Sequence, residues 1–350
     1  MNHASTTAPA GWRRWLGRGS GRLNLALQGG GAHGAYTWGV LDALLADERL
    51  HFEALSGSSA GAMNAVVLAE GWRRGGRAGA REALARFWNE LGQHMPWGLV
   101  SPQQGGGIGL GSAGKLLASW AGQFSPAQLN PFDLNPLRDL LAAQIDFDAL
   151  RAHSPFKLFV GTTQVNTARL RLFREHELSV DVLLASACLP RIHRTVVIDG
   201  EPYWDGGYSA NPAVFPLFYE CDARDVLLVL LNPLRRSHTP QSVAEIETRI
   251  AELGFNSHFM REMRMFAQAT GFAAPALGGR LEQRLRAMHF HMIGGSELES
   301  LARSDSKLLP HAPFLQHLHD LGLEDAQAWL RDCAPQLGRR STIDVPALFG

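Results

Sequence analysis

The hydrophobic positions along the chain predict buried strands that alternate with helices. Short apolar runs typical of buried parallel strands occur at residues 23–27, 52–56, 156–162 and 226–231. Between them, residues 35–45 place Tyr36, Val40, Leu41 and Leu44 on one helical face, and residues 62–68 and 180–188 also favour helix. This alternation indicates an α/β fold.

The pattern changes after Pro233, where long helical stretches dominate. Residues 243–265 predict an amphipathic helix, residues 288–293 a strand, and residues 313–337 two more helical stretches. We therefore expect three parts: a disordered N-terminal tail at residues 1–20, a main domain at residues 21–235, and a mainly helical C-terminal extension at residues 236–350 packed on that domain.

Two segments near the middle of the chain have no clear place in this scheme. Residues 105–114 are rich in glycine but lack the Gly-Lys-Ser/Thr ending of a phosphate loop, which favours a mobile loop beside a site. Residues 116–124, with Trp120, predict a short apolar helix that either lines a pocket or belongs to the core.

The apolar run at residues 52–56 leads directly into Gly57-Ser58-Ser59-Ala60-Gly61. This matches the G-x-S-x-G nucleophile elbow, a tight strand-to-helix turn that exposes one serine. Glycines on both sides relieve crowding in the strained turn, and the following helix N-terminus favours negative charge near Ser59. Because small residues are common, the motif alone is weak evidence.

A glycine-rich loop, Gly29-Gly30-Gly31-Ala32-His33-Gly34, joins the first predicted strand to the first helix. Its free backbone N–H groups suit an anion. One interpretation is a dinucleotide-binding loop, with Glu53 near the expected acidic position. The other is an oxyanion hole for a serine hydrolase, which we favour because the second strand runs on into the serine elbow. We expect His33 to pack or hold the loop.

Asp205 is the candidate carboxylate. It follows a predicted small hairpin and precedes Gly206 and Gly207. An Asp followed by two glycines is most often only a turn. Its significance therefore depends on the other motifs.

Composition narrows the classes of function. Lys and Arg total 33, as do Asp and Glu, so the net charge of +0 does not favour nucleic-acid binding. The three cysteines lack disulfide or metal-ligand spacing, and the pair His289 and His291 has no third ligand, so we expect no metal. No apolar run reaches about 20 residues and no signal sequence is evident, so we expect a cytoplasmic protein.

Taken in order, the loop Gly29–Gly34, the elbow Gly57–Gly61 and Asp205-Gly206-Gly207 resemble the motifs of the patatin-like phospholipase family. A further block of that family, a helix start of small residues that closes on proline, is matched by residues 185–190. The resemblance spans residues 23–231, and the segment after Pro233 is similar to extensions of bacterial members.

The resemblance implies a three-layer α/β/α fold with a mostly parallel sheet, and lipid acyl hydrolysis through a Ser–Asp dyad. Carried over by motif, Ser59 is the nucleophile and Asp205 the base that forms and resolves an acyl-enzyme. The oxyanion hole is expected at Gly29, Gly30 and Gly31, with Gly57 and Gly61 shaping the elbow and Gly206 and Gly207 supporting Asp205.

These observations imply a lipid or small acyl-ester substrate, no cofactor, no calcium dependence and possible peripheral association with a membrane. Three alternatives remain open. They are an NAD(P)-binding oxidoreductase that uses residues 29–34, an acyltransferase, and a lipid-binding regulator on the same fold. Head group, acyl-chain preference and oligomeric state are not encoded in these patterns.

Overall fold

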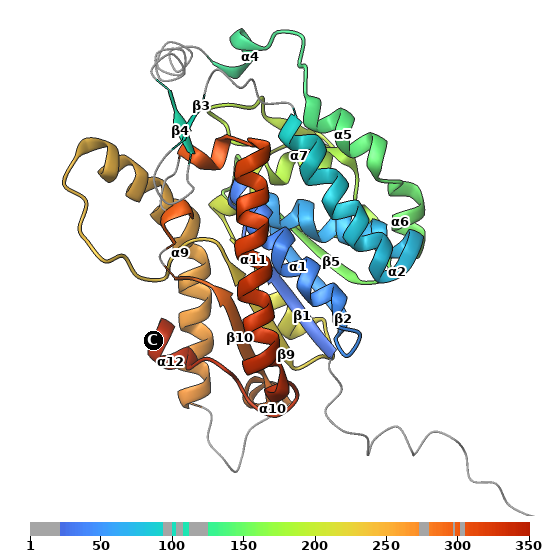
Figure 1. Cartoon of the computed structure of the whole chain (residues 1–350), viewed down its shortest axis with the longest axis vertical. Coiled ribbons are helices and arrows are strands. Elements are labelled where there is room, and N and C mark those ends of the chain that lie inside the picture. The colour runs from blue at the N-terminus through green and yellow to red at the C-terminus, as the bar shows by residue number, and fades with distance from the viewer. Residues whose placement is uncertain are drawn as a thin grey trace, which may run out of the picture.

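The computed structural model describes residues 22–93, 100–102, 108–111, 125–272, 280–296, 298–301 and 305–350 (Figure 1). The expected N-terminal tail, the helix expected at residues 116–124 and most of the glycine-rich segment 105–114 lie outside these residues.

The described residues form an eight-stranded central sheet with the order β10-β9-β1-β2-β5-β8-β7, and β6 also pairs with β5. The neighbours from β10 to β5 run parallel, whereas β6, β7 and β8 are antiparallel to their partners. The bounds are β1 Arg22–Leu27, β2 His51–Ser58, β5 Lys157–Gln164, β6 Leu170–Arg174, β7 Val196–Ile198, β8 Glu201–Asp205, β9 Asp225–Leu230 and β10 His289–Gly294. The strands expected from the apolar runs are confirmed.

Helices cover both faces of this sheet, because the central strands are apolar on both sides. In β9, Leu227 and Val229 belong to one core, whereas Val226, Leu228 and Leu230 belong to the other. Alternate side chains of the strand therefore belong to two cores on opposite faces of the sheet, which gives the expected three-layer α/β/α fold.

The first core packs against α1 (Gly34–Ala46), α2 (Ala60–Gln93), α5 (Pro136–Gln144), α6 (Phe147–His153), α7 (Val180–Ser186) and α11 (Ala312–Asp332). The second packs against α8 (Phe215–Tyr219), α9 (Val243–Phe272), α10 (Arg280–Ala287) and α12 (Val345–Phe349). The α4 helix (Pro126–Leu129) and the hairpin of β3 (Val100–Pro102) and β4 (Ile108–Leu110) lie at one end of the molecule (Figure 1). None of the helices in the described ranges is long and apolar enough to span a membrane.

The C-terminal segment is joined closely to the main sheet. β10 adds a parallel strand beside β9, and α11 lies directly on α1. The two helices meet through glycines, since a Cβ on Gly39 would overlap the carbonyl oxygen of His319 and one on Gly322 would overlap that of Tyr36. Close approach of the two backbones therefore depends on the absence of side chains at these positions.

We predict that Gly39→Ala lowers the free energy of unfolding by about 1–3 kcal/mol, because the added methyl group must push α11 away from α1. Urea denaturation measures the change. The control is Gly254→Ala in α9, where nothing lies within 4 Å of the added Cβ, so stability should be unchanged or slightly higher. Equal effects of the two substitutions would contradict this account of the α1–α11 contact.

Candidate active site

Ser59 occupies the turn between β2 and α2 in a strained backbone conformation. Its φ is +53°, a left-handed value that few residues other than glycine adopt. A Cβ on Gly57 would lie 2.5 Å from the carbonyl carbon of Gly61, and one on Gly61 would overlap the carbonyl oxygen of Leu27. The two glycines therefore let the turn fold back tightly and leave the Ser59 side chain partly accessible. This is the geometry expected of a nucleophile elbow.

A neighbouring serine holds the Ser59 backbone in place. The Ser59 N–H donates to the carbonyl oxygen of Ser186 at 3.1 Å and to its Oγ at 3.0 Å. The Ser186 hydroxyl in turn donates to the carbonyl oxygen of Gly161 at 2.7 Å. Ser186 lies at the end of α7, in the small-residue block at residues 185–190, so this block connects the elbow to β5.

Asp205 reaches Ser59 across β5. Ser58 at the end of β2 is aligned with Gly161 of β5, and the adjacent Thr162 is aligned with Asp205 of β8. A Cβ on Gly206 would overlap the carbonyl oxygen of Gly161, so glycine is needed where the chain turns away from β5. Sheet register therefore brings together two residues that are far apart in sequence.

The Asp205 carboxyl is almost completely buried, at 1% exposure. Its Oδ1 accepts a hydrogen bond from the Gly207 N–H at 2.7 Å, while its Oδ2 has no hydrogen-bond partner among the described residues. Burial raises the pKa of this carboxyl to about 7, against the smaller lowering effects of the Gly207 N–H and the nearby Ser59 hydroxyl. The site thus contains a buried carboxyl with a raised pKa and one oxygen that makes no hydrogen bond within the described part of the chain.

The glycine loop lies against the elbow. A Cβ on Gly29 would come within 2.8 Å of the Ser59 Cβ. The Gly29 N–H donates to Asn211 Oδ1 at 2.6 Å, and its carbonyl oxygen accepts from Asn211 Nδ2 at 3.2 Å. Gly29 is therefore a spacer held by Asn211, and its N–H, expected as an oxyanion donor, is already hydrogen-bonded in this structure.

The Gly30 and Gly31 N–H groups remain available, since neither makes a hydrogen bond within the described part of the chain. Gly31 has a φ of +59°, and a side chain on it would collide with the carbonyl oxygen of Lys307. The loop therefore offers two adjacent free donors beside Ser59, at the start of the short helical turn that leads into α1.

Gln28 and Asn211 support this loop and were not identified from the sequence. Gln28 is fully buried, and its Oε1 accepts the N–H groups of Leu231 and Asn232 at 2.7 and 2.8 Å. Its Nε2 donates to the Asn211 carbonyl oxygen at 3.2 Å and to Asn256 Oδ1 of α9 at 3.1 Å. Single buried amides carry no motif, so only the folded chain identifies them.

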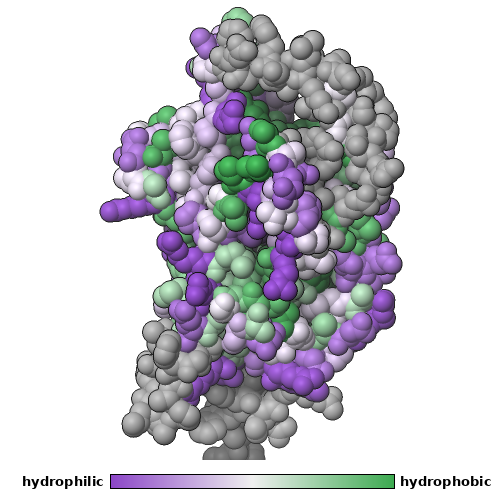
Figure 2. All heavy atoms as spheres, turned by 90° about the vertical axis from the view of Figure 1, so that its left-hand side faces the viewer, coloured by the Kyte–Doolittle hydropathy of each residue, from purple (hydrophilic) through white to green (hydrophobic). Residues whose placement is uncertain are grey.

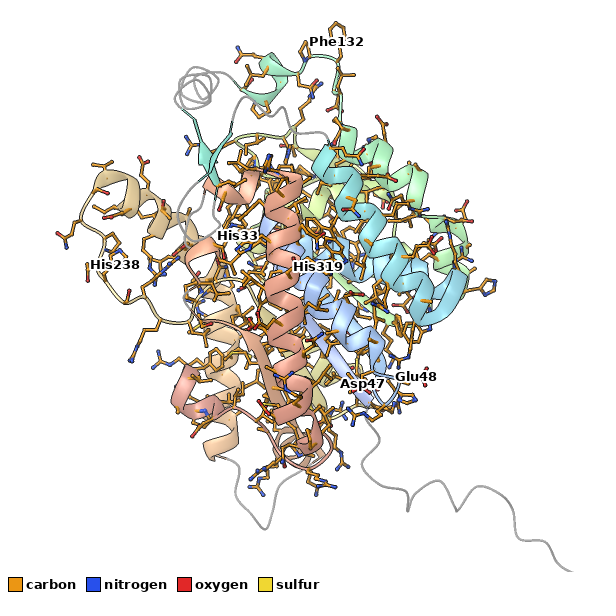
Figure 3. All side chains as sticks on the ribbon, in the orientation of Figure 1. His33, Asp47, Glu48, Phe132, His238 and His319 are labelled. Carbon is orange, nitrogen blue, oxygen red and sulfur yellow. The ribbon has the colours of Figure 1, made fainter. Side chains whose placement is uncertain are left out.

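His33 has a structural position, as expected. It is fully buried, as its place in the interior in Figure 3 illustrates, and its Nε2 lies 2.7 Å from Ser306 Oγ. Burial, together with the positive charge of Lys307, holds its pKa well below the usual value. A neutral histidine with this partner ties the glycine loop to the C-terminal segment.

Glu53, the acidic residue that the dinucleotide interpretation needs, does not lie near the glycine loop. Glu53 lies near the start of β2, at the opposite end of the strand from the elbow. It accepts the N–H groups of Asp222 and Ala223 at 2.8 and 2.7 Å and also pairs with Arg22 and Lys157. These contacts occupy Glu53 in holding a turn, away from any ligand at the glycine loop.

Within the described ranges, no cluster of three or more His, Cys, Asp or Glu side chains could hold a metal ion. His289 and His291 instead face Asp225. His289 Nδ1 lies 3.3 Å and His291 Nε2 lies 3.0 Å from Asp225 Oδ1. Asp225 also accepts the Gly338 N–H at 2.9 Å. These contacts fasten the end of the chain to the sheet.

We predict that Asp205→Asn stabilises the protein above pH 7. Because burial raises the pKa of this carboxyl in the folded state, ionising it costs stability as the pH rises from about 4 to about 7. A change from the reference value of about 3.9 to about 7 corresponds to roughly 4 kcal/mol. Urea denaturation of the wild type and of Asp205→Asn at pH 5 and pH 8 should therefore show that the substitution raises the free energy of unfolding more at pH 8.

The control for this measurement is Asp199→Asn, which removes an exposed carboxylate from the adjacent hairpin and should give no such difference between the two pH values. A gain for Asp205→Asn that does not depend on pH would show that ionisation of Asp205 does not limit stability.

A family model agrees with this architecture. The sequence model described as "Patatin-like phospholipase" matches residues 25–218, more than half of the chain and a range that includes Ser59 and Asp205. No curated protein matches the sequence. Among solved structures, VipD from Legionella pneumophila is 16% identical with a TM-score of 0.36, a remote likeness that covers 85% of this chain and 66% of that one. On the strength of the family match, the chain belongs to the patatin-like phospholipase family.

Proposed function

We propose that the protein is a lipid acyl hydrolase that cleaves carboxylic esters through Ser59, Asp205 and an acyl-enzyme. The observation that carries this proposal is the strained, partly accessible Ser59 beside a buried carboxyl whose Oδ2 has no other partner. Family membership gives the class of substrate, a lipid ester.

In the first half of the reaction, Asp205 Oδ2 takes the proton of the Ser59 hydroxyl as Ser59 Oγ attacks the ester carbonyl carbon. Negative charge develops on the carbonyl oxygen, where the free N–H groups of Gly30 and Gly31 stabilise it. The bond to the alcohol then breaks, and protonated Asp205 returns the proton to the departing oxygen.

In the second half, Asp205 accepts a proton from water, whose oxygen attacks the acyl-enzyme carbonyl. Collapse of that intermediate releases the fatty acid and returns the proton to Ser59. A carboxylate at its ordinary pKa of about 3.9 is a weak base for a hydroxyl, so burial of Asp205 contributes to both halves. No step needs a metal or a cofactor.

We predict that Ser59→Ala and Asp205→Asn each lower kcat/KM on p-nitrophenyl esters by about a thousandfold or more, because each removes a group that acts in every step. The wild-type activity should rise with pH through about 7, as Asp205 becomes ionised. Esters of graded chain length would also define the acyl preference.

Labelling with an organophosphate and mass spectrometry identifies the nucleophile. Ser58 is the matched control, because its buried hydroxyl donates to the Ala210 carbonyl oxygen at 2.6 Å and cannot attack a substrate. Ser58→Ala should keep the label and Ser59→Ala should lose it. Wild-type protein that is folded, unlabelled and inactive on every ester would refute the proposal, and tight binding of NAD or NADP would favour the dinucleotide alternative.

A second prediction concerns Asn211, the residue that holds Gly29. Asn211→Ala should lower kcat by about 10- to 100-fold with little change in KM, because the oxyanion donors lose their alignment while substrate contacts persist. Steady-state kinetics measures both constants. The control, Asn135→Ala, removes an amide that caps α5 by accepting the Arg138 N–H and makes no hydrogen bond to Ser59, Asp205 or the glycine loop within the described residues, so kcat should stay unchanged. A wild-type kcat for Asn211→Ala would mean that the loop holds its shape without this hydrogen bond.

A further inference from the structure

The first half of α9 carries an exposed apolar stripe. Val243, Ile246, Ile250 and Leu253 recur at spacings of three and four residues, which places them on one helical face. Their exposed fractions are 74, 43, 63 and 49%. Figure 2, which views the molecule from the side of α9, shows hydrophobic side chains grouped in the upper half of this face. We call these four residues the α9 stripe.

The residues that continue this spacing along α9 are polar or positively charged. The positions that continue the α9 stripe are Ser257, Arg261, Arg264 and Gln268, and all four are exposed. None of the helix's carboxylates belongs to this series. This series of positions is therefore apolar at one end and cationic at the other, and it contains no acidic side chain, while Glu245 and Glu247 are exposed beside its apolar end.

Two of the four acidic residues of α9 interact with groups inside the molecule, and the other two, Glu245 and Glu247, are exposed. Glu252 is buried and pairs with Arg236 and Arg249. Glu262 accepts the N–H groups of Val214 and Phe215 at the start of α8. The carboxylates of Glu252 and Glu262 therefore interact with other groups of the protein.

Other turns of α9 contact the candidate active site. The Phe255 ring packs at a tilt against Tyr208, with 4.6 Å between ring centroids, and lies against Gly207 beside Asp205. Asn256 accepts the hydrogen bond from Gln28, which supports the glycine loop. A single helix therefore connects the outward face to the elements that hold the dyad and the oxyanion donors.

We propose that the outward face of α9 docks the protein on an anionic lipid bilayer. The α9 stripe would lie among the acyl chains just below the head groups, and Arg261 and Arg264 would contact lipid phosphates. A second copy of the chain fits this face poorly, because an antiparallel pairing sets arginines against apolar residues and a parallel one sets arginines against each other. The proposal rests on the proposed lipid substrate.

Co-sedimentation with vesicles tests this docking surface. Full-length protein should bind vesicles of phosphatidylcholine with phosphatidylglycerol more tightly than vesicles of phosphatidylcholine alone, and salt should weaken the difference. The double variant Ile246→Gln/Ile250→Gln should lose at least tenfold in binding to the anionic vesicles. Arg261→Gln/Arg264→Gln should lose about fivefold for each arginine, on those vesicles only.

The matched control is Tyr219→Gln. Tyr219 is 65% exposed at the end of α8. It precedes β9 and therefore lies near the amino ends of the parallel strands, whereas Ser59 follows the carboxyl end of β2. The Tyr219→Gln variant should bind vesicles as tightly as the wild type. All these variants should hydrolyse a soluble short-chain ester at the wild-type rate, since none touches the dyad.

Two results would overturn the proposal: no binding of wild-type protein to anionic vesicles, or equal binding by the Ile246→Gln/Ile250→Gln variant. A wild-type dimer in light scattering that this variant converts to monomer would assign the face to self-association instead. Vesicle binding that depends on the α9 stripe, in a protein that cleaves no ester, would support docking and refute the proposed function.

Discussion

The site depends on three places where backbone segments approach more closely than side chains allow. Gly61 of α2 lies against the carbonyl oxygen of Leu27 in β1, Gly29 against that of Ser58, and Gly206 against that of Gly161. Each contact sets one component of the site against its neighbour: the elbow, the glycine loop and the turn after Asp205. The motifs are rich in glycine because any Cβ would separate these components.

This close packing has an energetic cost at the centre of the site. Ser59 adopts a left-handed φ, and Asp205 is buried with one oxygen that has no partner. Strain and desolvation of this kind persist only where the surroundings over-determine the conformation. Here the surroundings are Ser186, Asn211 and Gln28, whose hydrogen bonds fix the backbone of Ser59, of the glycine loop and of the turn after β9.

How far the sequence predicts this structure depends on how local each signal is. The strands, the elbow and the glycine loop are encoded by short runs of apolar or small residues, and they lie where expected. The roles of Asn211 and Gln28 are not local, since each amide acts on residues about 180 to 200 positions away in the chain. The unavailability of the Gly29 N–H follows from the same long-range contact, so no motif could reveal it.

The C-terminal segment shows the same limit on a larger scale. Its helices are evident from periodicity, but their partners are not: β10 extends the central sheet, α11 lies on α1, and α9 contacts Gly207 and Tyr208 beside Asp205. The family match ends at residue 218, so these contacts belong to the part of the chain that family motifs do not describe. Because Phe255 and Asn256 face inward and the α9 stripe faces outward, the helix that carries the exposed apolar residues also contacts the supports of Asp205 and the glycine loop.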